Sequence, residues 1–188
     1  MKKITFLILI LSMFSCAKKI YTSNEYFNCN NISDFNADTD KKQLIYTILE
    51  RAVVSKKDIA DYHLISDKNK VYVSDIAYSK FFGGIERPSE IPIEKSEVPN
   101  KINNVKFCIK SKPELQKIAD ETGNFLYLTL GNIEIKENTA KIGVMTSWSV
   151  SEKNKRKMVM MSGGGYVWEF EKKDGNWIFI KIISNFQS

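Results

Sequence analysis

Residues 166–183 read YVWEFEKKDGNWIFIKII, and this stretch decides the fold. Tyr166, Trp168 and Phe170 alternate with other residues, which is the period of a β-strand with one apolar face. Asp174-Gly175 is a residue pair that favours a tight turn with positive φ. The stretch therefore predicts a hairpin whose strands are 166–171 and 177–183. Its aromatic face either packs in the core or lines a ligand pocket.

Further apolar segments precede this hairpin, at 125–130, 133–135 and 140–148. The residues of the last of these alternate between apolar and polar or small side chains, and short turn signals separate the segments. We therefore expect an antiparallel meander that runs into the hairpin. In its closing strand, Ile178, Ile180 and Ile182 are predicted to share one face.

Helices are predicted earlier in the chain. Asp40 and Gln43 have capping-box spacing, and apolar residues recur at helical intervals from Leu44 to Val53. A short helix is expected at 55–62, and another begins at Ser111 and ends before Gly123. Helices first and a sheet last predict an α+β fold, in which N-terminal helices pack on a C-terminal antiparallel meander sheet.

The segments between these elements give weaker signals. Residues 71–76 and 105–109 read as strands. The 78–104 region contains Gly83-Gly84 and three prolines without a sustained apolar period, and we expect a long loop there.

The N-terminus has the build of a secretory signal. Lys2 and Lys3 precede an apolar run that is too short to span a bilayer, and the run closes at Ser15-Cys16. The Ser15-Cys16 junction resembles a bacterial lipobox, which implies cleavage before Cys16 and its acylation, including palmitate. The alternative is an ordinary signal peptide with an incidental cysteine. We expect a signal peptide at 1–15, a lipidated tether and irregular segment at 16–38, and a single α+β domain at 39–188.

The resemblance also gives a location. A lipid on Cys16 would hold the chain in a bacterial cell envelope, and Ala17 lacks an acidic retention signal. The expected place is therefore the outer membrane, facing the periplasm.

Removal of Lys2 and Lys3 lowers the net charge from +6 to +4. This modest excess is spread along the chain, and nucleic acid is not an expected partner outside the cytoplasm.

Two other cysteines remain, Cys29 and Cys108. Strand alternation places Cys108 on the face of residues 105–110 that also holds Lys106 and Lys110, which is not typical of a buried thiol. Two interpretations are open. Either Cys108 pairs with Cys29 in a disulfide, which an oxidising compartment permits, or it is a reactive thiol beside two lysines.

No constellation of residues predicts catalysis. His63 is the only histidine, and neither a metal site, a phosphate loop nor a nucleophile elbow is recognisable. Gly163-Gly164-Gly165 predicts a bulge or a close backbone approach at the start of a strand. The chain is therefore expected to be no enzyme and to need no cofactor or metal.

The segment from Gly163 to Trp177 resembles the closing hairpin of small bacterial lipoproteins. It is also similar to the last strands of cystatin-like cone folds of the nuclear-transport-factor-2 type. The second resemblance implies a cone whose inward side chains form a ligand or partner surface: Tyr127, Trp148, Tyr166 and Trp168. Enzymes of that class hold His, Asp or Tyr in the cavity, and these four include no His–Asp pair.

Three functional hypotheses follow. The first is a non-catalytic, membrane-anchored envelope lipoprotein that binds an unknown protein partner, as an inhibitor or immunity protein or as an envelope component. The second is a cone that holds a small apolar or aromatic ligand. The third, an enzyme of the cone class, is the least favoured.

Overall fold

The turn at Asp174-Gly175 forms as predicted. The two residues have φ values of 50° and 79°, and they join strands β9 (Gly164–Lys173) and β10 (Asn176–Gln187) into an antiparallel hairpin. A computed structural model describes residues 28–29, 35–79, 89–155, 157 and 161–187. The predicted signal peptide and Cys16 lie outside these residues.

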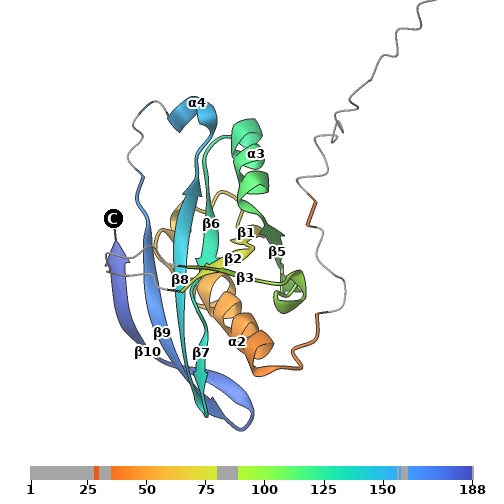
Figure 1. Ribbon diagram of the computed structural model, residues 1–188, viewed down its shortest axis with the longest axis vertical. Coiled ribbons are helices and arrows are strands. Elements are labelled where there is room, and N and C mark those ends of the chain that lie inside the picture. The colour runs from red at the N-terminus through yellow and green to blue at the C-terminus, as the bar shows by residue number, and fades with distance from the viewer. Residues whose placement is uncertain (1–27, 30–34, 80–88, 156, 158–160, 188) are drawn as a thin grey trace, which may run out of the picture.

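The chain is α+β, with one large and mostly antiparallel sheet (Figure 1). Its strand order is β10-β9-β8-β6-β1-β5-β4, and β7 pairs beside it with β8. The predicted meander is its C-terminal part: β6 (Phe125–Leu130), β8 (Thr139–Ser149), β9 and β10, with β7 (Glu134–Lys136) as a short addition.

The sheet is larger than the predicted meander. β1 (Lys70–Ser74) pairs in parallel with both β5 (Val105–Lys110) and β6. The reason is a crossover: helix α3 (Lys112–Thr122) connects β5 to β6, which lie on either side of β1. Strands joined by such a crossover run in parallel. Alternation within each strand does not reveal this pairing, which depends on distant segments.

The predicted long loop contains short regular elements. They are β3 (Glu90–Pro92), the 3-10 turn η3 (Lys95–Glu97) and β4 (Lys101–Ile102). β3 pairs with β2 (Ile76–Tyr78) in a separate two-stranded sheet, and β4 forms an edge of the large sheet. The strand expected at 71–76 is thus divided at Asp75. Residues 80–88 lie outside the described part of the chain.

Helix α2 (Asp40–Leu49) covers one face of the large sheet. Its N-cap is Thr39, whose hydroxyl accepts from the Lys42 amide at 3.3 Å, rather than Asp40 as predicted. The helix continues into a π-helical turn, η1 (Glu50–Ser55). The buried side of both elements is the predicted one: Leu44, Ile45, Ile48, Leu49, Ala52 and Val53. They join the main core with Trp168 and Phe170 of β9. In place of the short helix expected at 55–62, the 3-10 turn η2 comprises Tyr62–Leu64.

Helix α3 covers part of the opposite face. Its N-cap is Ser111, where the helix was predicted to begin; Ser111 and Glu114 form a capping box, and Gly123, with φ of 94°, ends the helix. Leu115, Ile118 and Ala119 pack there with Phe125 in a second, smaller core. Phe125 and Leu126 are neighbours in β6 and contact different cores, so the two helices lie on opposite sides of the sheet.

The second face of β5 is buried, contrary to the expectation from its lysines. Cys108 is fully buried, and Lys110 is only 2% exposed. A disulfide joins Cys108 to Cys29, with Cα atoms 4.7 Å apart. Only Lys106 of this face is exposed.

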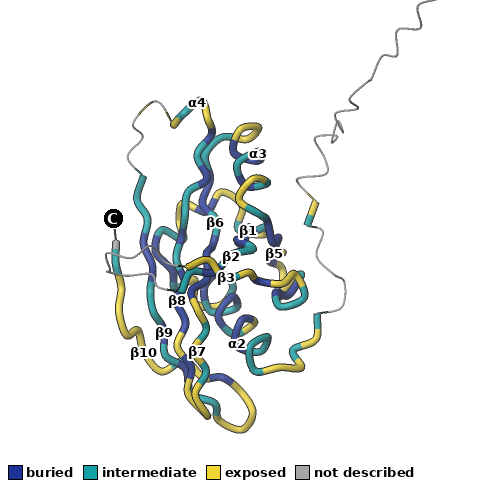
Figure 2. The backbone as a smooth tube through the Cα atoms, in the orientation of Figure 1, coloured by how far each residue is buried: buried dark blue, intermediate teal, exposed yellow. Residues whose placement is uncertain are grey.

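The glycine run at the start of β9 gives a close approach, as predicted. A Cβ atom added at Gly165 would lie 2.7 Å from both the Met145 Cβ and the Phe186 ring. β9 therefore passes closely between β8 and β10 at this point. Figure 2 shows the consequence for the sheet as a whole: its middle strands are largely buried, whereas β10 is mostly exposed.

Candidate functional site

Strand β10 holds most of the large hydrophobic side chains that are exposed among the described residues. Six such side chains are exposed in all. Four of them are isoleucines of β10, each between 41 and 44% exposed: Ile178, Ile180, Ile182 and Ile183. Single exposed apolar residues are ordinary, but a group on one strand is informative.

These isoleucines do not share one face, as simple alternation predicted. Two β-bulges interrupt the pairing of β10 with β9, between Phe179 and Lys181 and between Ile182 and Ser184. Ile180 and Ile183 are the additional residues at the two bulges. Ile178 lies opposite Glu171 and Ile182 lies opposite Trp168, which are on different faces of β9. What the four side chains share is therefore the edge of the sheet and not a face.

The backbone along this edge has no strand partner among the described elements. β10 is the terminal strand of the sheet and pairs with β9 alone. Two nearby lysines are paired with carboxylates of β9: Lys181 Nζ lies 3.2 Å from a Glu169 oxygen, and Lys173 Nζ lies 2.8 Å from a Glu171 oxygen. An edge with unpaired N–H and C=O groups and apolar side chains is a template for strand addition.

Aromatic packing holds β10 from its inner side. The Phe179 ring makes edge contacts with Trp168 and Phe170, at centroid distances of 6.2 and 5.9 Å. The Arg51 guanidinium lies over Phe179 and donates to Asp58 at 2.5 Å. Arg51 belongs to the π-helical turn η1, so the edge strand is fixed to the helix side of the core.

The predicted aromatic surface is not assembled. Trp168 is fully buried in the core. Trp148 is partly buried against the same core, and its Nε1 donates to the Ser162 carbonyl at 2.5 Å. Tyr166 also packs partly on this core, but Tyr127 lies on the opposite face with α3. Burial raises the pKa of the Tyr127 hydroxyl. Tyr127 therefore lies on the other face of the sheet from Trp148, Tyr166 and Trp168.

A pocket of about 380 Å³ lies between α2 and the β9–β10 turn. Its lining includes Gln43, Tyr46, Thr47, Asn176 and Trp177. Gln43 Oε1 and Trp177 Nε1 have no hydrogen-bond partner among the described residues, but both atoms are shielded from the surface. These two atoms are therefore not available to a ligand, although the lining also includes the polar side chains of Tyr46, Thr47 and Asn176.

A polar cluster lies at the carboxyl end of β1, beside α3. Burial raises the pKa of Asp75, and the Glu114 and Glu90 carboxylates raise it further. Burial also raises the pKa of Glu114, but hydrogen bonds from the Ser111 amide and hydroxyl, with the Lys110 charge, lower it below its usual value. Lys110, Ser111 and Glu114 hold one another and the start of α3. Asp75 Oδ1 is buried without a hydrogen-bond partner among the described residues.

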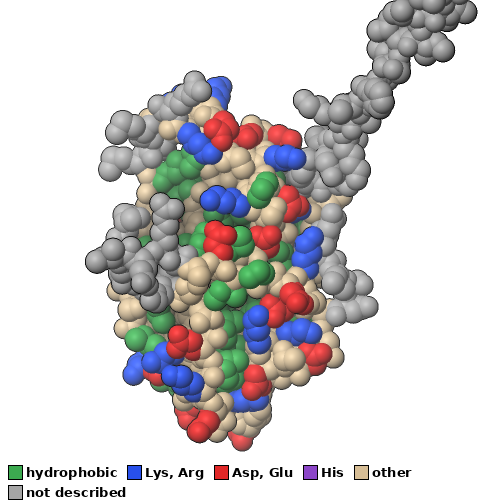
Figure 3. All heavy atoms as spheres, viewed as in Figure 1, with side chains coloured by type: hydrophobic (Ala, Val, Ile, Leu, Met, Phe, Trp, Pro, Cys, Tyr) green, Lys and Arg blue, Asp and Glu red, His purple; other side chains and the backbone are tan. Residues whose placement is uncertain are grey.

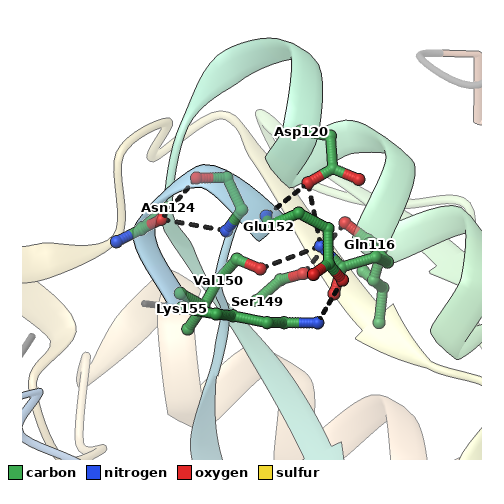
Figure 4. A network of polar contacts seen from close by, with 9 residues as sticks. Gln116, Asp120, Asn124, Ser149, Val150, Glu152 and Lys155 are labelled. Atoms are coloured by element: carbon green, nitrogen blue, oxygen red, sulfur yellow. Dashed lines mark hydrogen bonds and ion pairs between the residues drawn. The ribbon is translucent and has the colours of Figure 1, made fainter. Parts of the chain in front are cut away.

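A second polar network fastens α3 to the end of β8 and to helix α4 (Glu152–Lys155), as Figure 4 shows. Asn124 Oδ1 accepts from the Ser151 amide at 3.0 Å and from Asn154 Nδ2 at 3.1 Å. Asp120 Oδ1 accepts from the Glu152 amide at 2.7 Å. Because these groups satisfy one another, the network is a structural junction and offers no reactive group.

Among the described residues, neither the surface charges nor the metal-ligating side chains indicate another site. On the face drawn in Figure 3, acidic and basic side chains are interspersed, without a large area of one sign. Within the described residues, no group of three or more metal-ligating side chains occurs. His63 lies exposed in η2. None of the helices in the described part of the chain is long and apolar enough to cross a membrane.

Comparisons with protein-family models, with curated proteins and with solved structures found no match to this chain. Its function is therefore inferred from its own residues and geometry.

Sequence reasoning named the residues of β10 but not their role. Alternation predicted that Ile178, Ile180 and Ile182 share one face of the strand. The signal that was available is the density of isoleucine between residues 178 and 183.

Proposed function

We propose that the chain is a membrane-anchored envelope lipoprotein, and not an enzyme, that binds a protein partner along the edge of β10. The observation that supports this is the group of exposed isoleucines on a strand that pairs, among the described elements, with β9 alone. The partner contributes an extended segment that continues the sheet. Main-chain hydrogen bonds give such a complex its affinity, and side-chain contacts give it specificity.

The distribution of the isoleucines favours an extended strand over a helix. Ile178 and Ile182 point to opposite faces of the sheet, and the other two lie at bulges. A helix laid on one face would cover only some of them. A strand added beside β10 has side chains on both faces and contacts the whole group.

A second copy of this chain fits the edge less well than a different protein. Lys181 lies near the middle of β10. Two β10 strands paired antiparallel about this residue would bring two ammonium groups opposite each other, each with only one Glu169 carboxylate 3.2 Å away, and like charges directly opposite each other destabilise a strand pair. The preferred partner segment is therefore apolar, and acidic or neutral at the position facing Lys181.

The anchor in this proposal is Cys16, on the basis of the lipobox-like junction. Acylated at that residue, the chain would be held at the outer membrane on its periplasmic side. A partner that is neutralised there, or another envelope component, suits a protein with an edge for binding and no catalytic group.

A small-ligand function has weaker support. The pocket beside the hairpin is lined by Tyr46 and Trp177, but the polar atoms without partners are not accessible from it. The aromatic residues expected to line a cone are divided between two faces of the sheet.

Native gel electrophoresis of gently solubilised membranes tests the proposal. The wild-type chain should migrate in an assembly larger than its monomer. An Ile180→Lys/Ile182→Lys double variant should migrate as a monomer, because two charges then replace apolar contacts at the edge. Leu64→Lys is the matched control, since Leu64 is also exposed but lies in η2. Equal migration of all three chains, or an assembly that contains only this chain, would contradict the proposal.

A further inference from the structure

The Lys110 amine is covered although lysine is among the side chains that are most often exposed. Its side chain is 2% exposed. Nζ donates to the Asn28 carbonyl at 2.9 Å and lies 3.5 Å from Glu114 Oε1. A buried ammonium group is tolerated when it is paired in this way.

The contact with Asn28 joins residues 82 positions apart in the chain. The neighbour of Asn28 is Cys29, and its disulfide partner Cys108 lies two residues before Lys110 in β5. Cys108 and Lys110 therefore point to the same side of the strand. The disulfide therefore holds Cys29, and with it the Asn28 carbonyl, beside the Lys110 amine.

We propose that the Cys29–Cys108 disulfide is a redox-controlled clasp. Its reduction releases the segment at Asn28–Cys29 from β5 and uncovers the Lys110 amine. The rest of the fold does not depend on this segment, because the main core is built from α2, η1 and the sheet.

The reductant is a dithiol. One of its thiolates attacks Cys29 Sγ, which is the more accessible sulfur because Cys29 is partly exposed and Cys108 is fully buried. The S–S bond breaks, and Cys108 leaves as a thiolate and takes up a proton. The second thiol of the reductant then attacks the mixed disulfide and releases the Cys29 thiol. Two electrons and two protons pass to the protein, and the dithiol becomes a cyclic disulfide.

The disulfide joins Cys29 to β5, which lies near the end of the strand order opposite to β10, as Figure 1 shows.

Amine labelling of the full chain tests the clasp. The oxidised chain and a chain reduced with dithiothreitol are acylated with an amine-reactive ester, and labelled lysines are quantified by peptide mass spectrometry. Labelling of Lys110 should rise at least tenfold on reduction. Lys106 is the internal control, because it lies exposed in the same strand, and its labelling should not change.

Two further measurements make the result decisive. In the Cys29→Ser variant, Lys110 should be labelled without any reductant. The fluorescence of the buried Trp168 should stay native both in this variant and in the reduced chain. Protection of Lys110 in a chain whose two thiols are both alkylated would overturn the proposal. General unfolding on reduction, seen as exposure of Trp168, would overturn it as well. Neither outcome depends on whether a partner binds β10.

Discussion

The Arg51 guanidinium carbon lies 3.5 Å from the centre of the Phe179 ring. The same side chain is paired with Asp58 and lies 5.6 Å from the centre of the Trp168 ring. One residue thus connects the π-helical turn η1, β9 and the edge strand β10. β10 is therefore held on its inner side, and among the described strands it pairs with β9 alone.

Replacing Arg51 with Met should lower the free energy of unfolding by about 1–2 kcal/mol, because the cation–π contact and the hydrogen bond to Asp58 are both lost. Urea denaturation measures the change. Lys56→Met, at an exposed position close by in the chain, is the control and should change stability by less than about 0.5 kcal/mol. Equal losses in the two variants would show that Arg51 does not fasten the edge strand.

Trp168 tests whether the aromatic face of β9 is core or pocket. The side chain is fully buried, so Trp168→Ala should cost about 3–5 kcal/mol in urea denaturation. Ile182→Ala, at the residue opposite on β10, should cost less than about 1 kcal/mol because Ile182 is 41% exposed. A Trp168→Ala chain that melts near the wild-type temperature would favour a pocket at this face.

The polar cluster beside α3 predicts two pH effects of opposite sign. The folded chain raises the pKa of Asp75, so it binds the proton more tightly than the unfolded chain does. Ionisation of Asp75 therefore opposes folding as the pH rises above the ordinary value of 3.8. Asp75→Asn should increase the free energy of unfolding at neutral pH, and the gain should disappear in acid.

Glu114 behaves in the opposite way, because its pKa is lowered in the folded chain. Its contribution to stability is present above the ordinary value of 4.5 and is lost as the pH falls through the folded value. Glu114→Gln should therefore destabilise the chain at neutral pH and have less effect in acid. Urea titrations of both variants between neutral and acidic pH provide the measurement. Parallel pH profiles of the two variants would refute this assignment.

Cys16 decides whether the chain is anchored by lipid. Cys16→Ala should release the protein from the membrane fraction or leave the precursor uncleaved, because neither acylation nor cleavage at a lipobox proceeds without the cysteine. Cell fractionation with immunoblotting measures this, and Cys29→Ala is the matched control that should stay with the membrane. Normal processing and retention of the Cys16→Ala chain would rule out the lipoprotein proposal.

Local patterns in the sequence predicted the local structure well. The Asp174-Gly175 turn, the capping box of Ser111 and the buried side of α2 depend on residues that are close in the chain. The approach at Gly165 was also predicted, because a strand that begins in glycine has room for close neighbours.

The Cys29–Cys108 disulfide was one of two open interpretations, but the other features that depend on distant segments were not predicted. The parallel pairing of β1 arises from the crossover through α3, and alternation is the same in parallel and antiparallel strands. Lys110 is buried because residues far away in the chain cover it, which its polar character does not suggest. The bulges of β10 move the isoleucines off the face that a regular strand would give them. The isoleucines of the candidate binding edge could therefore be recognised in the sequence, but their positions in the sheet could not.

Site-specific photo-crosslinking in the native envelope tests the central claim, that β10 is the binding edge, most directly. A photoreactive residue is placed at Ile178, Ile180 or Ile182, and at Lys101 of β4 on the other edge of the sheet as the control. Irradiation should give an adduct with one partner protein from the three β10 positions, and none from Lys101. Adducts of equal strength at both edges, or adducts only between copies of this chain, would contradict the claim.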